Sequence, residues 1–208
     1  FELTETGTGL RYDSNLCQIP SNEVQDRKDE VIEYYKEQGE QLGKLMIKEY
    51  PTGTATVQTL RSHIEKLSLK GFIPQVLIID YADIMRSSRQ YDSMRHELKK
   101  VYEDLRNLAM EKSMPIWTAS QSNRDSANSD IVGLENMSES YGKAQVADVV
   151  ISISRKPAEK SEGFGRLYIA KNRAGRDGIV FPIKLNTAMS RFSILENSEE
   201  MSFMDAKK

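Results

Sequence analysis

The sequence predicts an α/β fold with a mostly parallel, twisted sheet, helices on both of its faces and an antiparallel C-terminal hairpin. Short apolar runs lie at Val76–Ile79, Ile116–Ser120 and Val149–Ile153. A helix pattern separates the first two and a loop the last two, and this order of elements is typical of a parallel α/β sheet. By contrast, Arg166–Lys171 and Ile179–Leu185 are joined by only seven residues. That connection is too short for a crossover helix, so these two strands are expected to run antiparallel.

Length and composition narrow the class of protein. The chain has 208 residues, enough for one domain with a sizeable core. Its formal net charge of −2 argues against a protein that coats duplex DNA, although a ring that touches nucleic acid through a few loops remains compatible. The single cysteine, Cys17, excludes an internal disulfide and fits a reducing compartment. Because no apolar run reaches the length of a membrane span, we expect no membrane partner.

The first part of the chain is expected to be mainly helical. Pro20 and its polar neighbours break the chain between the first two helices. Thr56 is a plausible N-cap for a later amphipathic helix, and Gly71 follows its end. The expected elements are helices at Thr4–Asn15, Asp26–Leu42 and Val57–Leu67, and a short strand at Leu45–Glu49.

The second part contains the clearest helix and the predicted hairpin. Apolar residues recur at steps of four and three from Met94 to Leu108, which predicts an amphipathic helix. The stretch from Gln121 to Glu139 is polar and has neither a helix nor a strand pattern. Pro182 predicts that its strand lies at a sheet edge, and Arg191–Leu195 is a candidate last strand. We therefore expect one domain over residues 1–195 and a polar tail over 196–208.

Polar residues follow two of the predicted parallel strands. Asp80 ends the first apolar run, and Ser120 and Gln121 end the second. Open α/β sheets bind ligands at the carboxyl ends of their strands, where an aspartate can hold a magnesium ion. A neutral amide at that edge can sense a γ-phosphate by exchanging a hydrogen bond. Asp80 could equally cap a turn and Gln121 begin a surface loop, and these residues alone leave that choice open.

Five segments carry the most specific signals of the chain: Phe1-Glu-Leu, Ile78-Ile-Asp-Tyr, Ala119-Ser-Gln-Ser-Asn-Arg, the stretch from Glu139-Ser140 to Ala147-Asp-Val-Val, and Ile169-Ala-Lys-Asn-Arg-Ala-Gly. In their order and spacing they resemble the DnaB family of replicative helicases, which have a RecA-like motor domain of the P-loop NTPase class. The match extends in register to about Leu195, and two further segments, Tyr50-Pro-Thr-Gly and Trp117-Thr-Ala, are most similar to the tailed-phage members.

The resemblance implies ATP and Mg²⁺ as ligands and gives a role to several residues. Glu2 would orient and deprotonate the attacking water, and Asp80 would bind Mg²⁺. Lys171 and Arg173, two residues apart on a strand, would point the same way and reach the ATP site of a neighbouring subunit. The alternative is that the two residues form a basic hairpin tip in solvent and have no catalytic role. The nucleotide site would comprise Asp80, Tyr81, Ser120 and Gln121, with Gln121 also acting as the γ-phosphate sensor.

The resemblance also implies partners and a location. The loop after Gln121 would contact mainly the sugar-phosphate backbone of single-stranded DNA, as suits a motor that ignores sequence. Identical subunits, six being expected, would form a ring, and primase and a helicase loader are further candidate partners. The protein would work in the cytoplasm of a bacterial or phage-infected cell. The expected DNA contacts are Asn123, Arg124, Ser138 and Lys143.

The chain departs from the family in one respect. The P-loop motif, G-x-x-x-x-G-K-[ST], is absent from the 208 residues. In the family it precedes the segment of the catalytic glutamate, so we expect the first strand, P-loop and helix to lie before Phe1 and the chain alone to be inactive. Two alternatives stay open: another RecA-like ATPase of the recombinase or clock type, and a non-catalytic fragment or assembly module.

Overall fold

The computed structural model describes residues 3–89, 91–123, 129–136 and 141–195. The chain forms two compact units. One contains Tyr50–Ser154 and Tyr168–Val180, and the other contains Leu3–Glu49, Arg155–Leu167 and residues 181–195. The expected tail, 196–208, lies outside the described residues. None of the described helices combines the length and the apolar character needed to cross a membrane.

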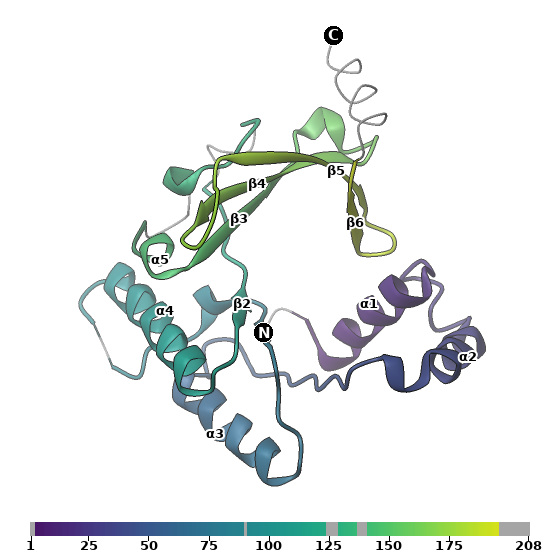
Figure 1. Ribbon diagram of the computed structural model, residues 1–208, viewed down its shortest axis with the longest axis horizontal. Coiled ribbons are helices and arrows are strands. Elements are labelled where there is room, and N and C mark those ends of the chain that lie inside the picture. The colour runs from purple at the N-terminus through teal and green to yellow at the C-terminus, as the bar shows by residue number, and fades with distance from the viewer. Residues whose placement is uncertain (1–2, 90, 124–128, 137–140, 196–208) are drawn as a thin grey trace. The chain divides into compact units, whose positions relative to one another are not determined.

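The first unit contains a parallel strand pair next to two packed helices. Strand β1 (Leu77–Ile79) pairs with β2 (Ile116–Thr118) in parallel, and Ile78 stands opposite Trp117. Helices α3 (Val57–Leu69) and α4 (Met94–Glu111) pack against each other, and α4 also contacts β2 (Figure 1). The parallel pair, together with the antiparallel strands described below, confirms the predicted α/β class.

Helix positions follow from the apolar spacing and from the caps. The Thr56 side chain accepts from the Thr59 backbone N–H, and the Thr59 side chain accepts in return from the Thr56 N–H, so the predicted N-cap is confirmed as a reciprocal capping pair. In α4 the predicted stripe is buried except at Met94, which is 66% exposed at the first position of the helix. The buried members are Leu98, Val101, Leu105 and Leu108, joined by Tyr102.

Two residues of α4 provide a matched test of this core. Leu108 is fully buried, whereas Met110 is 71% exposed. We expect Leu108→Ala to lower the free energy of unfolding by about 2–5 kcal/mol, since the lost transfer energy adds to the cost of a cavity. Met110→Ala is expected to stay within about 0.5 kcal/mol. Denaturant titration of both variants measures the difference, and equal losses would contradict the assigned packing of α4.

The remaining strands form a four-stranded sheet in the order β3-β4-β5-β6. Leu185 N–H donates to the Gly163 carbonyl and Gly178 N–H to that of Ile169, so one partner's number rises as the other's falls, as in an antiparallel hairpin. β5 and β6 are antiparallel as well. The strands are β3 (Val149–Ser154), β4 (Phe164–Asn172), β5 (Ile179–Asn186) and β6 (Arg191–Ile194).

Two expectations about these strands need correction. β3 was predicted to lie near the parallel pair, but its sheet neighbour is β4, because an apolar run does not specify its pairing partner. The edge position predicted from Pro182 is wrong, since β5 lies between β4 and β6. Pairing with β6 starts at Ile183, so the missing N–H of Pro182 falls at the end of the ladder, where its carbonyl accepts from Leu195.

One face of the parallel pair is more exposed than its apolar sequence predicts. Ile79 is buried, yet Ile78 and its partner Trp117 are 60% and 53% exposed. Alternate residues of β3, namely Val149, Ile151 and Ile153, are likewise exposed. These strands were expected to be covered on both faces. Among the described residues, the Ile78–Trp117 face has no covering layer.

The second unit begins with two helices, as predicted. Helices α1 (Glu5–Cys17) and α2 (Lys28–Gln38) contact each other, and a small core of Ile19, Val24 and Val31 lies beside them. The strand expected at Leu45–Glu49 does not form. The Glu49 N–H donates to the Glu5 carboxylate instead of to a neighbouring strand. Shorter helices are η1 (Gly39–Gln41), η2 (Ala82–Ile84), η4 (Leu134–Asn136), α5 (Tyr141–Val146) and η5 (Pro157–Glu159).

Candidate functional site

The carboxyl ends of β1 and β2 bring the predicted nucleotide residues together. Asp80 follows β1 directly, and Gln121 comes three residues after the end of β2. The amide of Gln121 is 3.4 Å from the hydroxyl of Tyr81, to which it donates. Thr118 fixes the two strand ends, because its hydroxyl accepts from Ala82 N–H at 2.9 Å and donates to the Ile79 carbonyl at 3.0 Å. Asp80 and Gln121 are both exposed at this edge.

A buried polar network lies beneath this edge. The Asp83 carboxylate accepts from Lys143 Nζ and from the Ser120 hydroxyl, both at 2.8 Å, and from the Tyr102 hydroxyl at 2.7 Å. Lys143 also donates to Ser120 at 3.0 Å. Burial, and after it the negative charge of Asp83, raises the pKa of Tyr102 well above its ordinary range. Tyr102 therefore stays a protonated donor at every physiological pH.

The network changes the interpretation of two predicted residues. Lys143 was expected to contact DNA phosphates, but its side chain is 0% exposed and ion-paired with Asp83, so the ammonium group cannot reach a phosphate here. The Ser120 hydroxyl is bonded to Asp83 and Lys143, which leaves Gln121 as the exposed polar group of that strand end. Sequence reasoning missed Asp83, although a lone acid between Ala82 and Ile84 was a signal for a buried partner.

The predicted finger residues lie near the end of β4 and contact the C-terminal end of α5. Lys171 Nζ donates to three backbone carbonyls, those of Ala144 at 2.8 Å, Gln145 at 3.1 Å and Ala147 at 2.8 Å. Burial, followed by the charge of Arg173, lowers the pKa of Lys171. A cation at this position satisfies carbonyls that have no partner within the helix.

Arg173 makes a more exposed set of contacts. Its guanidinium is 2.6 Å from the Asp148 carboxylate, and the two side chains are 47% and 56% exposed. Arg106, from α4, approaches the same carboxylate at 2.9 Å and donates to the Val146 carbonyl at 2.5 Å. Sequence reasoning selected neither Arg106 nor Asp148 for a role. An exposed pair of this kind holds Arg173 weakly and leaves it free to move to another anion.

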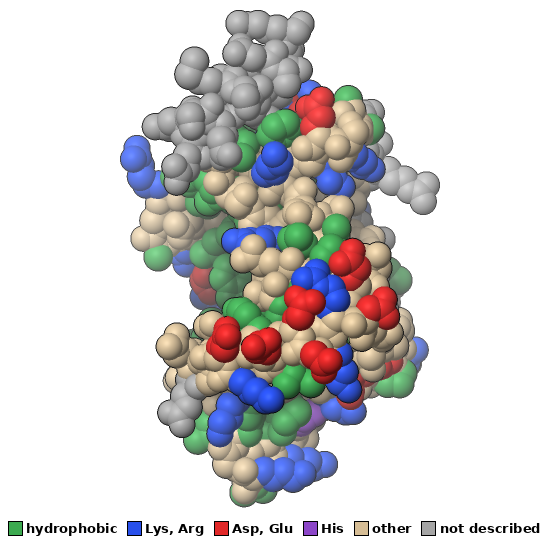
Figure 2. Space-filling view, turned by 90° about the vertical axis from the view of Figure 1, so that its right-hand side faces the viewer, with side chains coloured by type: hydrophobic (Ala, Val, Ile, Leu, Met, Phe, Trp, Pro, Cys, Tyr) green, Lys and Arg blue, Asp and Glu red, His purple; other side chains and the backbone are tan. Residues whose placement is uncertain are grey.

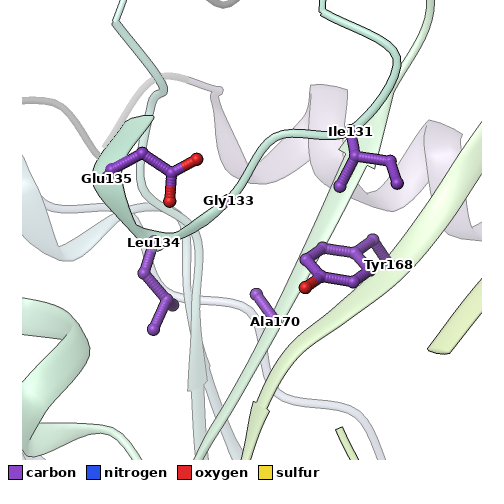
Figure 3. Close-up of a pocket in the computed structure, with 6 residues that line it drawn as sticks. All are labelled: Ile131, Gly133, Leu134, Glu135, Tyr168 and Ala170. Atoms are coloured by element: carbon purple, nitrogen blue, oxygen red, sulfur yellow. The ribbon is translucent and has the colours of Figure 1, made fainter. Parts of the chain in front are cut away.

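The described part of the predicted DNA loop borders a hollow of about 540 Å³. Figure 3 shows Ile131 and Tyr168 on one side of it and Leu134 and Glu135 on the other, with Ala170 between. Tyr168 comes from β4, two residues before Ala170, so both side chains point to the same face of the strand. Tyr168 therefore adds an aromatic side chain from β4 to the lining of this hollow.

Several predicted residues are not placed by the structure. Glu2, Arg124 and Ser138 lie outside the described residues, whereas Asn123 is described and half-buried. Figure 2 shows acidic and basic side chains intermingled on one face, with apolar side chains between them. That described face is therefore no continuous basic stripe, in keeping with the net charge of −2.

Comparison with known proteins decides the family. Residues 2–194 match the family described as the DnaB-like helicase C-terminal domain. The chain belongs to this DnaB-like family. It is 31% identical over 162 residues to the DnaB-like replicative helicase of Enterobacteria phage T4, covering 73% of this chain and 34% of that protein. A probable replicative DNA helicase of Trieres chinensis is 28% identical over 151 residues, covering 68% and 33%.

Solved structures show the same fold for this DnaB-like chain. A solved ATPase domain superposes with a TM-score of 0.78 at 18% identity, over 94% of this chain and 72% of that chain. A DnaB-like replicative helicase studied for its interactions with primase gives a TM-score of 0.78 at 17% identity, over 94% and 49%. The DnaB-like chain spans about a third of the length of the first two curated relatives.

The residues at the strand edge fit a magnesium ion of the kind that accompanies a nucleotide. Mg²⁺ keeps several waters and is usually bound through one or two carboxylates together with substrate phosphates. Asp80 offers one exposed carboxylate at the edge, and no cage of three or more acidic, His or Cys ligands occurs among the described residues. An edge of this kind suits a metal shared with a nucleotide.

Proposed function

We propose that the chain is the motor part of an ATP-dependent replicative DNA helicase that moves on single-stranded DNA and unwinds duplex. One observation carries the proposal: Asp80 and Gln121 lie exposed at the shared carboxyl edge of two parallel strands in a member of the DnaB-like family. The same family membership favours a helicase over a recombinase-type or clock-type ATPase.

In this proposal each residue acts through its position. Asp80 would hold Mg²⁺, and the ion would help to neutralise negative charge on the phosphates of ATP. Tyr81 orients the Gln121 amide through their shared hydrogen bond. Gln121 senses the γ-phosphate, and Glu2 orients and deprotonates the attacking water. Arg173 acts on the ATP of a neighbouring subunit, with Lys171 beside it.

The partners follow from the same proposal. Asn123, Arg124 and Ser138 remain proposed DNA contacts in the segment after Gln121, and Lys143 is withdrawn because it is buried. Identical subunits form a ring, with six as the proposed number. Primase is a proposed partner because a similar structure is of a DnaB-like helicase with primase interactions. A helicase loader and a cytoplasmic site of action complete the proposal.

Asp80→Ala in the complete gene product tests the proposed function. We expect DNA-stimulated ATP hydrolysis and unwinding to fall about a hundredfold or more, since metal coordination contributes several kcal/mol to the transition state and each 1.4 kcal/mol is tenfold in rate. Asp26→Ala, at an exposed carboxylate just before α2, is the matched control and should leave both rates unchanged. Normal turnover by the Asp80→Ala variant would exclude the proposed metal site.

A further inference from the structure

Helix α5 is held at both ends by side chains from other elements. Lys143, in its first half, is fully buried against Asp83 and Ser120. At its C-terminal end, Lys171 donates to the carbonyls of Ala144 and Ala147. A six-residue helix is too short to be stable through its own hydrogen bonds. Its position is therefore set by these two groups of contacts.

The buried contacts of Lys143 join the segments that follow β1 and β2. The carboxyl edge of these two strands, with Asp80 and Gln121, is called the nucleotide edge below. Asp83 lies three residues after Asp80, and Ser120 directly precedes Gln121. Lys143 Nζ is 2.8 Å from the Asp83 carboxylate and 3.0 Å from the Ser120 hydroxyl, so one ammonium group holds both segments. The charge also lies 5.9 Å from the centre of the Tyr102 ring. A buried charge is tolerated only when paired in this way, which makes the geometry exacting.

The position of α5 in the chain relates this network to the segment proposed to contact DNA. The helix directly follows the segment proposed to contact DNA, which begins after Gln121 and ends before Tyr141. Within the described part of that segment, η4 contacts α5. A shift of η4 would therefore displace α5, and the displacement would act on Asp83 and Ser120 through Lys143. Because packed cores have few alternative arrangements, a small shift there changes the spacing of the neighbouring groups instead of being absorbed.

We propose that Lys143 is a positioning residue that couples the DNA-contacting segment to the nucleotide edge, by holding α5 against Asp83 and Ser120. The proposal rests on the helicase function proposed above. Lys143 touches neither ATP nor DNA; it sets the distance between the segments that carry Asp80 and Gln121. DNA binding is then transmitted to ATP turnover through a buried ion pair.

The test uses the complete gene product with Lys143→Met alone and together with Asp83→Asn. The double variant removes both charges and keeps a polar group that can accept from Tyr102 and Ser120. ATP turnover is measured with and without an oligo(dT) strand, and the affinity for the same strand by fluorescence anisotropy. We expect the DNA stimulation factor to fall about two- to thirtyfold in both variants, with the affinity unchanged. Lys99→Met, at a side chain that is 45% exposed on α4, is the matched control.

A second variant tests the network without removing a buried charge. Tyr102→Phe deletes one hydrogen bond to Asp83 and keeps the ring in the core. We expect a smaller loss of stimulation, about two- to fivefold, with the melting temperature nearly unchanged. The stimulation factor of Tyr102→Phe therefore tests the positioning role even if the Lys143 variants do not fold.

Other outcomes separate the two proposals. Stimulation that remains at the unsubstituted level in folded variants would overturn the positioning role. Loss of oligo(dT) affinity together with stimulation would also overturn it and would make Lys143 a direct DNA contact. Turnover reduced in proportion to the folded fraction, with an unchanged stimulation factor, would show a purely structural lysine. Absence of DNA stimulation in the unsubstituted protein would instead refute the proposed helicase function.

Discussion

Arg173→Ala in the complete gene product is expected to reduce ATP turnover about a thousandfold, the effect that removal of an arginine finger can have. Folding should survive, because the Arg173–Asp148 pair is exposed and such pairs contribute at most about 1 kcal/mol. ATP binding by one subunit should also be nearly intact. Lys171→Ala is a less specific test, since Lys171 also caps α5 through three carbonyls.

Mixing experiments distinguish action on a neighbouring subunit from action within one chain. Arg173→Ala subunits are combined with Asp80→Ala subunits, and the ATPase rate is measured against the mixing ratio after subunit exchange has been verified. If Arg173 acts in trans, some interfaces in a mixed ring pair an intact Asp80 with an intact Arg173, and part of the activity returns.

The opposite result has an equally definite meaning. No rescue at any ratio, with mixed rings demonstrated, would show that Arg173 serves its own subunit or only forms its surface pair with Asp148. The single-chain structure gives Arg173 a resting position on Asp148 and on the Gln145 carbonyl. Leaving that position costs little because both charges are already hydrated.

The 208-residue chain alone is expected to show no measurable ATP hydrolysis, with or without single-stranded DNA. Its sequence contains no P-loop, and the backbone N–H groups of that loop supply most of the donors that cradle the phosphates. Without the P-loop, the carboxylate of Asp80 can attract Mg²⁺, but its negative charge repels phosphate. We therefore expect nucleotide binding to be weak as well.

The comparison protein for this experiment is the complete gene product, assayed under identical conditions. Circular dichroism of the 208-residue chain establishes that it is folded, so that inactivity is not mistaken for unfolding. DNA-stimulated turnover by the chain alone would refute the expectation and require a phosphate site built from other residues. Inactivity of the complete gene product as well would favour the alternative of a non-catalytic assembly module.

Local patterns predicted most of the helices because their signals are short-ranged. The four-three spacing placed α4, and Thr56 was recognisable as a cap from its own neighbours. The short β4–β5 connection fixed the antiparallel hairpin on length alone. The strand expected at Leu45–Glu49 failed, since a strand requires a partner and its own sequence does not provide one.

The sequence by itself determined the α/β class, the order of the chemical segments and the family they resemble, because spacing and residue type are properties of the chain. Only the tertiary structure decided which side chains meet. It placed β3 beside β4 and gave the buried charge of Lys143 a partner in Asp83, 60 residues away. A lysine in a polar stretch is most often solvated, and a core surrounds it only when distant segments fold together. That long-range packing is why a residue predicted to contact DNA became the link between α5 and the nucleotide edge.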